Sequence, residues 1–230
     1  MNPTPVALAW SGGKDSAMAL AALRADPRLE VVALVTTITR DYDRISIHGV
    51  RRDVLEAQVE AIGIRLVEVA IPPTASNAIY EAAFAETLAG LRGTHADLNQ
   101  IAFGDLFLAD VRAYRERLLE PLGWTPLFPL WGAETAALAA SFIACGFRAV
   151  LTCVDTTQIA ADFAGRQFDA ALLADLPATA DPCGENGEFH TCVYAGPVFS
   201  RPLRLRTGER VLRDRRFQYC DLLLDDAAAG

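Results

Sequence analysis

Short runs of apolar, largely β-branched residues alternate along the chain with longer segments whose apolar residues recur at helical spacing. Runs of this kind are typical of buried strands, and the longer segments are typical of helices. The predicted strands are Val6–Trp10, Val31–Ile38, Arg65–Ile71, Ile101–Gly104 and Ala149–Val154. The predicted helices are Ser16–Arg24, Val50–Ile62, Asn77–Leu91, Val111–Leu119 and Glu134–Cys145. This alternation predicts the α/β class, with a five-stranded parallel sheet covered by helices on both faces.

The alternation stops after Asp155. Residues 156–198 are rich in Asp, Gly and Pro, and Pro202–Arg206 and Val211–Leu224 are then predicted to be strands around Thr207-Gly208-Glu209. We therefore expect an α/β domain over residues 1–155, a small C-terminal α+β or β-hairpin region over residues 156–224, and a tail over residues 225–230.

The first predicted strand leads directly into the loop Ser11-Gly12-Gly13-Lys14-Asp15-Ser16, which opens the first predicted helix. Two adjacent glycines permit backbone angles that let successive N–H groups point into one concavity. The helix behind the loop adds unpaired N–H donors and the positive end of its dipole. The hydroxyl groups, the ammonium of Lys14 and the carboxylate of Asp15 add donors, a counter-charge and a magnesium ligand. The loop therefore predicts a phosphate-binding site.

The spacing of this loop is neither that of the Walker loop nor G-x-G-x-x-G. It matches S-G-G-x-D-S, the pattern of the PP-loop ATP pyrophosphatases, which adenylate a substrate and release pyrophosphate. Of the 21 basic residues, Lys14 is the one lysine. A compact ammonium suits a phosphate in a crowded loop better than a planar guanidinium does. The pattern predicts that residues 1–155 bind ATP and split it between the α and β phosphates.

Composition narrows the class of protein further. The formal net charge is −8 and the pI is about 4.9, so a general attraction to nucleic acid is not expected. The arginine-rich stretch Arg201–Arg216 is the local exception, and the solvated face of a hairpin is favoured there over an anion or RNA contact. The sequence has no apolar run long enough to span a membrane and no signal-peptide pattern, and its five cysteines form no disulfide framework. We expect a cytoplasmic protein.

A second signature is the segment Asp181–Thr191, followed by Cys192–Pro197. Together with the phosphate loop it resembles the diphthine–ammonia ligase family, and the resemblance extends over essentially the whole chain. The further stretches that carry it are His48–Arg51, Gly104-Asp105, Tyr114–Arg117, Pro126–Gly132 and Cys153–Thr156. In detail the chain is more similar to the short bacterial branch of that family than to the enzymes that complete diphthamide on an elongation factor.

The resemblance implies an adenine nucleotide alpha hydrolase-like (HUP, Rossmann-like) fold and an ATP-dependent ligase. The substrate carboxylate would attack the α-phosphorus of ATP and release pyrophosphate, and ammonia would then displace AMP to leave an amide. ATP and Mg²⁺ are the implied cofactors. The partners would be ammonia and a carboxylate on a small molecule or a protein side chain. The oligomeric state is left open, a homodimer included.

The candidate site residues follow from the two signatures. Lys14, Asp15, Glu188 and His190 are the catalytic candidates. In the second signature the predicted substrate-binding residues are Gly184, Glu185, Asn186, Gly187 and Glu188, and the resemblance adds His48. The residues alone favour a glycine-rich turn whose carboxylates are solvated. The resemblance favours a site instead, in which the glycines would let the backbone approach a ligand, the carboxylates would hold a cationic substrate or ammonium, and His190 would relay a proton.

Further nucleotide-binding candidates lie where other predicted strands end. Thr36 and Thr37 end the second strand, where an adenosine would lie in this type of sheet. Gly104 and Asp105 end the fourth. Asp105 is a second candidate metal ligand beside Asp15, although an Asp in this position caps the next helix equally often.

Two other functions remain open on the sequence. One is a tRNA-modifying PP-loop enzyme, for which the stretch Arg201–Arg216 is the one supporting feature, and which often needs paired reactive cysteines. No C-x-x-C motif is present, and Cys145 and Cys153 are predicted to be small buried hydrophobes. The other is a non-catalytic sensor that binds an adenine nucleotide.

Overall fold

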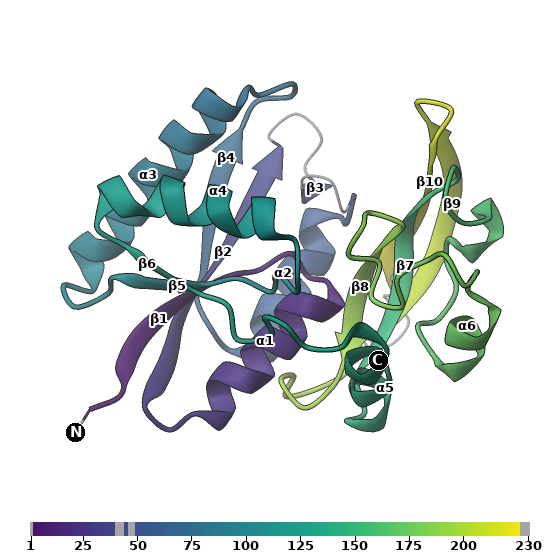
Figure 1. Ribbon diagram of the computed structural model, residues 1–230, viewed down its shortest axis with the longest axis horizontal. Helices are drawn as coiled ribbons and strands as arrows, with labels where there is room; N and C mark the ends of the chain where they lie inside the picture. The colour runs from purple at the N-terminus through teal and green to yellow at the C-terminus, as the bar shows by residue number, and fades with distance from the viewer. Residues whose placement is uncertain (1, 40–43, 46–48, 226–230) are drawn as a thin grey trace. The chain divides into compact units, whose positions relative to one another are not determined.

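The structure is a computed structural model that describes residues 2–39, 44–45 and 49–225. By its contacts the chain divides into two compact units. The first consists of Met1–Ser11, Asp15–Ser46 and Ile64–Gly132, and the second of Gly12–Lys14, Ile47–Gly63 and Ala133–Gly230. Each unit is described by itself (Figure 1).

The first unit is built on a parallel sheet. Its strands are β1 (Thr4–Ala9), β2 (Leu29–Thr39), β4 (Leu66–Ile71), β5 (Gln100–Ala102) and β6 (Thr125–Leu127). The pairings give the parallel order β4-β2-β1-β5-β6, and the two-residue strand β3 (Arg44–Ile45) pairs antiparallel with the end of β2. The predicted α/β class with a five-stranded parallel sheet is confirmed. The strand order reverses between β1 and β5, and in such sheets ligands bind outside the carboxyl ends of the strands at this point.

The helices of this unit are α1 (Lys14–Ala25), which begins in the second unit's segment, α3 (Asn77–Thr94) and α4 (Ala109–Leu119), with a 3₁₀ turn at Glu120–Leu122. One core cluster joins Phe84 and Leu88 of α3 and Leu119 of α4 to alternate residues of the strands. Those strand residues are Ala7, Ala33, Val35, Val69 and Ile101. The intervening Val6 and Leu8 are also fully buried, so both faces of the sheet are covered. Right-handed crossovers place α1 on the face opposite α3 and α4, because the chain reverses direction after β4.

The strand predicted to be fifth in the parallel sheet is not the one that the structure has there. The run Ala149–Val154 does form a strand, β7 (Arg148–Asp155), but it pairs antiparallel with two later strands, so its assignment to the parallel sheet was wrong. A run that is buried on both faces has no period that reveals the direction of its neighbours. The fifth parallel strand is the short β6, which contains Pro126, and proline is tolerated there because β6 lies at the sheet's edge.

The sheet of the second unit has the order β8-β7-β10-β9 and is antiparallel throughout. Its other strands are β8 (Phe189–Ala195), β9 (Leu205–Arg213) and β10 (Phe217–Leu224), and its helices are α2 (Arg52–Ile62), α5 (Thr135–Ala144), the 3₁₀ turn Ala161–Phe163 and α6 (Ala170–Asp175). The hairpin turn predicted at Thr207-Gly208-Glu209 was wrong, because these residues lie inside β9 and the chain turns at Asp214–Arg216. A register shift faces this segment between Cys220 and Leu222, and glycine inside a strand often marks such a bulge.

The two compact units are defined by contacts alone and need not coincide with functional domains. The division that we predict after residue 155, between a nucleotide-binding domain and a substrate-binding region, therefore stays a prediction.

Candidate functional site

The phosphate loop follows β1 and leads into α1, as its sequence predicts, and its residues 14–16 form the first turn of that helix. Gly12 has φ +76°, a left-handed conformation that suits glycine. Gly12, Gly13, Lys14 and Ser16 are buried, and the hydroxyl of Ser11 donates to the hydroxyl of Ser16 over 3.3 Å. By its contacts the middle of the loop, Gly12–Lys14, belongs to the second unit. The elements that hold this part of the loop therefore come from the second unit.

Strand β8 contacts this part of the loop at three places. The N–H of Val193 donates to the carbonyl of Gly12 over 2.9 Å, and the hydroxyl oxygen of Thr191 accepts from the N–H of Lys14 over 3.0 Å. The Lys14 ammonium lies 5.7 Å from the centroid of the Phe189 ring, a cation–π contact. Alternate residues of one strand thus fix both the backbone and the side chain of the loop.

Gln58 of α2 is a further support that the sequence analysis missed. Its side-chain amide donates to the carbonyl of Gly12 over 3.0 Å and to the carbonyl of Val193 over 2.6 Å, and the residue is fully buried. A Cβ atom at Gly12 would lie 2.7 Å from Gln58 Oε1. The available signal was a polar residue within the apolar stripe of a helix, flanked at helical spacing by Val54 and Ile62. Such a residue needs buried hydrogen-bond partners.

His190 follows Phe189 on β8. Burial, and in second place the charge of Lys14, lower the pKa of its imidazole to about 4. The ring is therefore neutral at physiological pH. As a base it is weaker than a histidine with an ordinary pKa.

A pH dependence of stability follows from this shift. Between pH ~6.5, the ordinary histidine pKa, and the folded value, the unfolded chain binds a proton at His190 that the folded chain does not. This contribution to the free energy of unfolding is fully present above the ordinary pKa and is lost as pH falls toward the folded value of about 4. We expect the melting temperature of wild type to fall more steeply over this window than that of His190→Gln. Parallel curves in thermal melts would contradict the expectation.

The glycine-rich segment before β8 is held by its own carboxylates. Asp181 Oδ2 accepts from the N–H groups of Cys183, over 3.1 Å, and Glu185, over 2.9 Å. Gly184 and Gly187 have φ +69° and +85°. Gly184 also needs to be glycine because a Cβ there would lie 2.9 Å from the carbonyl oxygen of Phe189. The result is a compact loop that leads directly into the strand that holds Lys14.

Glu188 is the most deeply buried carboxylate of this loop, with 1% of its surface exposed. Its Oε1 accepts from the N–H of Asp181 over 2.7 Å and from the side-chain amide of Asn186 over 3.2 Å. Its Oε2 is buried and has no hydrogen-bond partner among the residues that the structure describes. A buried carboxylate oxygen without a partner costs free energy unless a donor or cation joins it.

The other side of this loop rests on Asp155 at the end of β7. Its N–H donates to the carbonyl of Glu188 over 2.8 Å, and Arg216 donates to its carboxylate over 2.6 Å. Gln158 bridges the same carboxylate, over 3.1 Å, and the carbonyl of Asn186, over 3.4 Å. The Arg216 guanidinium, partly opposed by burial, holds the pKa of Asp155 well below its usual range. Asp155 is thus a charged anchor for the loop rather than a titrating group.

The remaining candidates lie in the first unit. The Thr36 hydroxyl donates to the carbonyl of Trp10 over 2.7 Å and is buried, and Thr37 beside it is partly buried. Gly104 packs on the phosphate loop, because a Cβ there would lie 2.8 Å from the backbone carbon of Asp15. Asp105 forms an ion pair with Arg115, with 3.2 Å between Nε and Oδ2. A metal ion at Asp105 would have to compete with that guanidinium. His48 lies outside the described residues.

Comparison with known proteins covers both units. One family model, the diphthamide synthase N-terminal domain, matches residues 4–126, and a second, the diphthamide synthase C-terminal domain, matches residues 134–222. The chain belongs to the diphthamide synthase family. It is also similar to the diphthine–ammonia ligase of Schizosaccharomyces pombe, with 25% identity over an alignment of 229 residues that covers 92% of this chain and 38% of the ligase. The chain therefore spans less than half the length of that relative.

The cysteines of this family member give no sign of a metal or thiol site in the described residues. None of the five forms a disulfide, and no group of three or more His, Cys, Asp or Glu side chains that could hold a metal ion occurs there. Burial raises the pKa of Cys153 to about 11 and that of Cys192 to about 12, which makes both thiols unreactive at neutral pH. Cys153 is buried as predicted, but the prediction for Cys145 was wrong, since this residue caps the end of α5 and is exposed.

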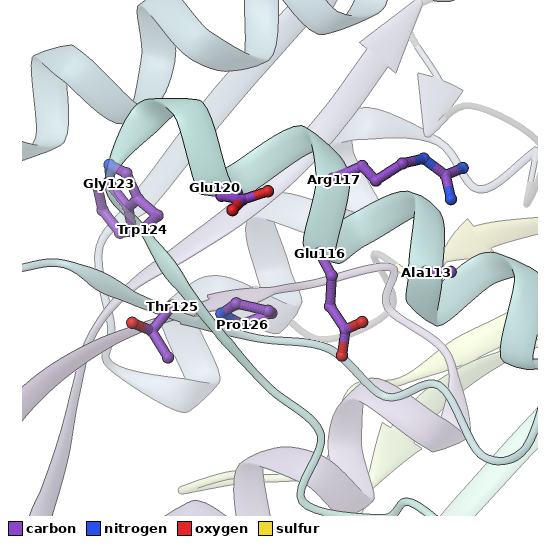
Figure 2. Close-up of a pocket in the computed structure, with 8 residues that line it drawn as sticks. All are labelled: Ala113, Glu116, Arg117, Glu120, Gly123, Trp124, Thr125 and Pro126. Atoms are coloured by element: carbon purple, nitrogen blue, oxygen red, sulfur yellow. The ribbon is translucent and has the colours of Figure 1, made fainter.

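An open groove of about 640 Å³ lies beside α4 and β6 in the first unit. Figure 2 shows Glu116 and Arg117 on the helix and Thr125 and Pro126 on the strand beside it. None of the groove's lining residues is a candidate from the two signatures. Trp124, which also lines it, is 4% exposed and belongs to the core cluster. None of the described helices is both long and apolar enough to cross a membrane.

Proposed function

We propose that this chain is an ATP-dependent ligase that adenylates a carboxylate, releases pyrophosphate and converts the carboxylate into an amide with ammonia. The observation that carries the proposal is that the buried Glu188 directly precedes strand β8, which holds Lys14 of the phosphate loop through Thr191, three residues after Glu188. The S. pombe relative is named a diphthine–ammonia ligase, and the family match supports the same class of reaction here. The carboxylate belongs to a small molecule or to a protein side chain.

In the first step, a carboxylate oxygen of the substrate attacks the α-phosphorus of ATP and the bond to the bridging oxygen breaks. Negative charge then develops on the departing pyrophosphate. The loop N–H groups and the Lys14 ammonium are preorganised to stabilise this charge, because β8 and Gln58 already fix the backbone of the loop. Thr36, Thr37 and Gly104 are the proposed supports of the nucleoside.

A magnesium ion fits one end of this arrangement. Asp15 follows Lys14 directly, and Mg²⁺ is usually held by one or two carboxylates together with phosphate oxygens and water. Bound there, it would neutralise charge on the pyrophosphate. Asp105 would contribute a second carboxylate only after parting from Arg115.

In the second step, ammonia attacks the acyl carbon, AMP leaves, and the nitrogen loses a proton. The free Oε2 of Glu188 is suited to hold a cationic group of the substrate or an ammonium ion, since that atom is buried without a described partner. Neutral His190 is able to accept a proton in this step, because its lowered pKa keeps it unprotonated at physiological pH. Gly184, Glu185, Asn186 and Gly187 would shape the loop around the substrate.

Phosphorus NMR tests this proposal directly. The protein is incubated with ATP, magnesium, ammonium and fractions of a metabolite pool, and the phosphorus products are identified. AMP with pyrophosphate, dependent on one fraction, is the expected result and leads to the substrate. ADP with phosphate would overturn the proposal.

Gln58 offers a test of the loop itself. We expect Gln58→Met, which keeps the side-chain length but removes the amide, to weaken ATP binding ~10-fold or more, because two buried carbonyls lose a donor, each worth ~1–3 kcal/mol. Titration calorimetry measures this affinity. Gln167→Met is the matched control, since Gln167 accepts from the exposed hydroxyl of Tyr194 in the same unit. Equal ATP affinity in the two variants would show that Gln58 does not position the loop.

A further inference from the structure

Arginines are concentrated in one hairpin of this acidic chain. Residues 201–216, here called the arginine hairpin, contain seven arginines and two acidic residues, whereas the whole chain has a formal charge of −8. The segment comprises β9 and the turn to β10, drawn at the yellow end of the chain in Figure 1. All seven arginines are exposed. The surface of the molecule is therefore strongly uneven in charge.

Two of these arginines have structural partners. Arg201 pairs with Glu60 over 2.8 Å, and Arg216 pairs with the buried Asp155 over 2.6 Å. The other five form no salt bridge with a carboxylate among the described residues; they are Arg204, Arg206, Arg210, Arg213 and Arg215. No carboxylate in the part of the chain that the structure describes thus neutralises their charges through a salt bridge.

The turn of the hairpin has an arginine at a position where the backbone conformation favours glycine. Asp214 and Arg215 have φ 52° and 55°, and the N–H of Arg216 donates to the carbonyl of Arg213 over 3.0 Å. Two successive left-handed residues define a tight hairpin turn whose second position strongly favours glycine. Asp tolerates this conformation, but Arg does so only at a cost. An arginine stands at the tip where glycine would be relaxed.

Edge protection explains part of this pattern. β9 lies at the edge of its sheet, and charged side chains keep such edges from pairing with other strands. That role accounts for arginines on β9 itself. It does not require Arg204 before the strand or Arg215 on the turn.

We propose that the arginine hairpin binds the phosphodiester backbone of a nucleic acid. Exposed guanidinium groups bind phosphate through paired N–H donors. An acidic protein surface fits less well, because protein interfaces have an apolar or aromatic centre, and Leu212 is the one large hydrophobic residue of the hairpin that is strongly exposed, at 53%. A second copy of the chain would bring like charges together along β9. The net charge of the whole molecule opposes this binding, so contact is confined to the hairpin.

The salt dependence of binding measures the contact. With a fluorescent single-stranded RNA, five arginine–phosphate contacts predict a slope of log K against log salt of about −3.5, at ~0.7 per contact. We expect the triple variant Arg204→Ala, Arg206→Ala, Arg213→Ala to lose most of the affinity and to lower the slope to about −1.4. The control triple Arg28→Ala, Arg117→Ala, Arg148→Ala makes the same change in net charge at exposed arginines elsewhere and should bind as wild type does. Equal binding by the two triples would overturn the proposal.

Arg215→Gly separates binding from folding. This variant relaxes the turn, so its melting temperature should rise while its affinity for the RNA falls. A higher melting temperature with unchanged affinity would show that Arg215 does not contact the RNA and that the strain at the turn does not serve binding. A DNA strand of the same sequence distinguishes the sources of the phosphodiester, since equal affinity shows that the 2′-hydroxyl is not read. Displacement of the RNA by polyglutamate of equal charge would assign the hairpin to acidic proteins and overturn the proposal.

Discussion

Replacing Lys14 with alanine is expected to lower the rate of pyrophosphate release ~10²–10³-fold, the usual effect of removing one preorganised charge-stabilising donor. Lys14 is 4% exposed, and its ammonium lies over the Phe189 ring. The charge is therefore held in a partly desolvated position, where it acts more strongly on a phosphate than it would in water. Phosphorus NMR or a coupled pyrophosphate assay measures the loss.

Two further variants separate the charge from the packing of this side chain. Lys14→Met keeps most of the volume without the charge and should lose as much activity as alanine while melting near the wild-type temperature. Lys14→Arg keeps the charge, but its larger planar group has little room in a buried loop, so we expect at least a ~10-fold loss as well. Full activity of Lys14→Met would contradict the assignment of the phosphate loop.

Lys14 can also be observed alone. Because it is the one lysine of the chain, isotope-labelled lysine gives a single side-chain amine signal in NMR. ATP should shift that signal if the ammonium meets a phosphate, and the shift does not depend on finding the acid substrate. An unchanged signal under saturating ATP would place the nucleotide elsewhere.

The fold class could be predicted from sequence because both of its signals are local. Apolar runs at strand length and helical spacing between them identify β1, β2, β4 and β5, and strand-loop-helix order identifies the phosphate loop. β6 was missed because three residues with a central proline give no strand signal. β7 was placed in the wrong sheet because burial on both faces does not encode strand direction.

The site could be predicted only where it depends on local motifs. The two signatures identify Lys14 and Glu188 as candidates, although these residues are far apart in the sequence. They do not predict that β8 links the two residues or that Gln58 supports the loop. Those contacts depend on how β8 and α2 pack in the second unit, over sequence separations that no local pattern spans. Asp155 was likewise noted only as part of a resemblance, and its ion pair with Arg216 became visible with the antiparallel pairing of β7 and β10.

Glu188→Gln is expected to reduce amide formation ~10²-fold or more while ATP affinity stays within about a factor of 2. A buried charge pair is worth ~2–5 kcal/mol when one partner is removed, and glutamine removes the charge without changing the size of the side chain. Oε1 retains its two donors, Asp181 and Asn186, so the loop should keep its conformation. ATP affinity is measured by calorimetry and turnover by the release of AMP.

The effect expected of Glu188→Gln depends on Oε2 of Glu188. In wild type Oε2 is buried without a described partner, which costs stability that a bound cation would return. If Oε2 serves only the fold, Glu188→Gln should raise or lower the melting temperature without changing turnover at a permissive temperature. If it holds a cationic group, the variant should melt at or above the wild-type temperature and still fail to turn over. Asp162→Asn, which removes one exposed carboxylate charge from the same unit, controls for net charge and should behave as wild type in both measurements. Loss of ATP binding in Glu188→Gln would instead mean that the glycine-rich loop belongs to the nucleotide site.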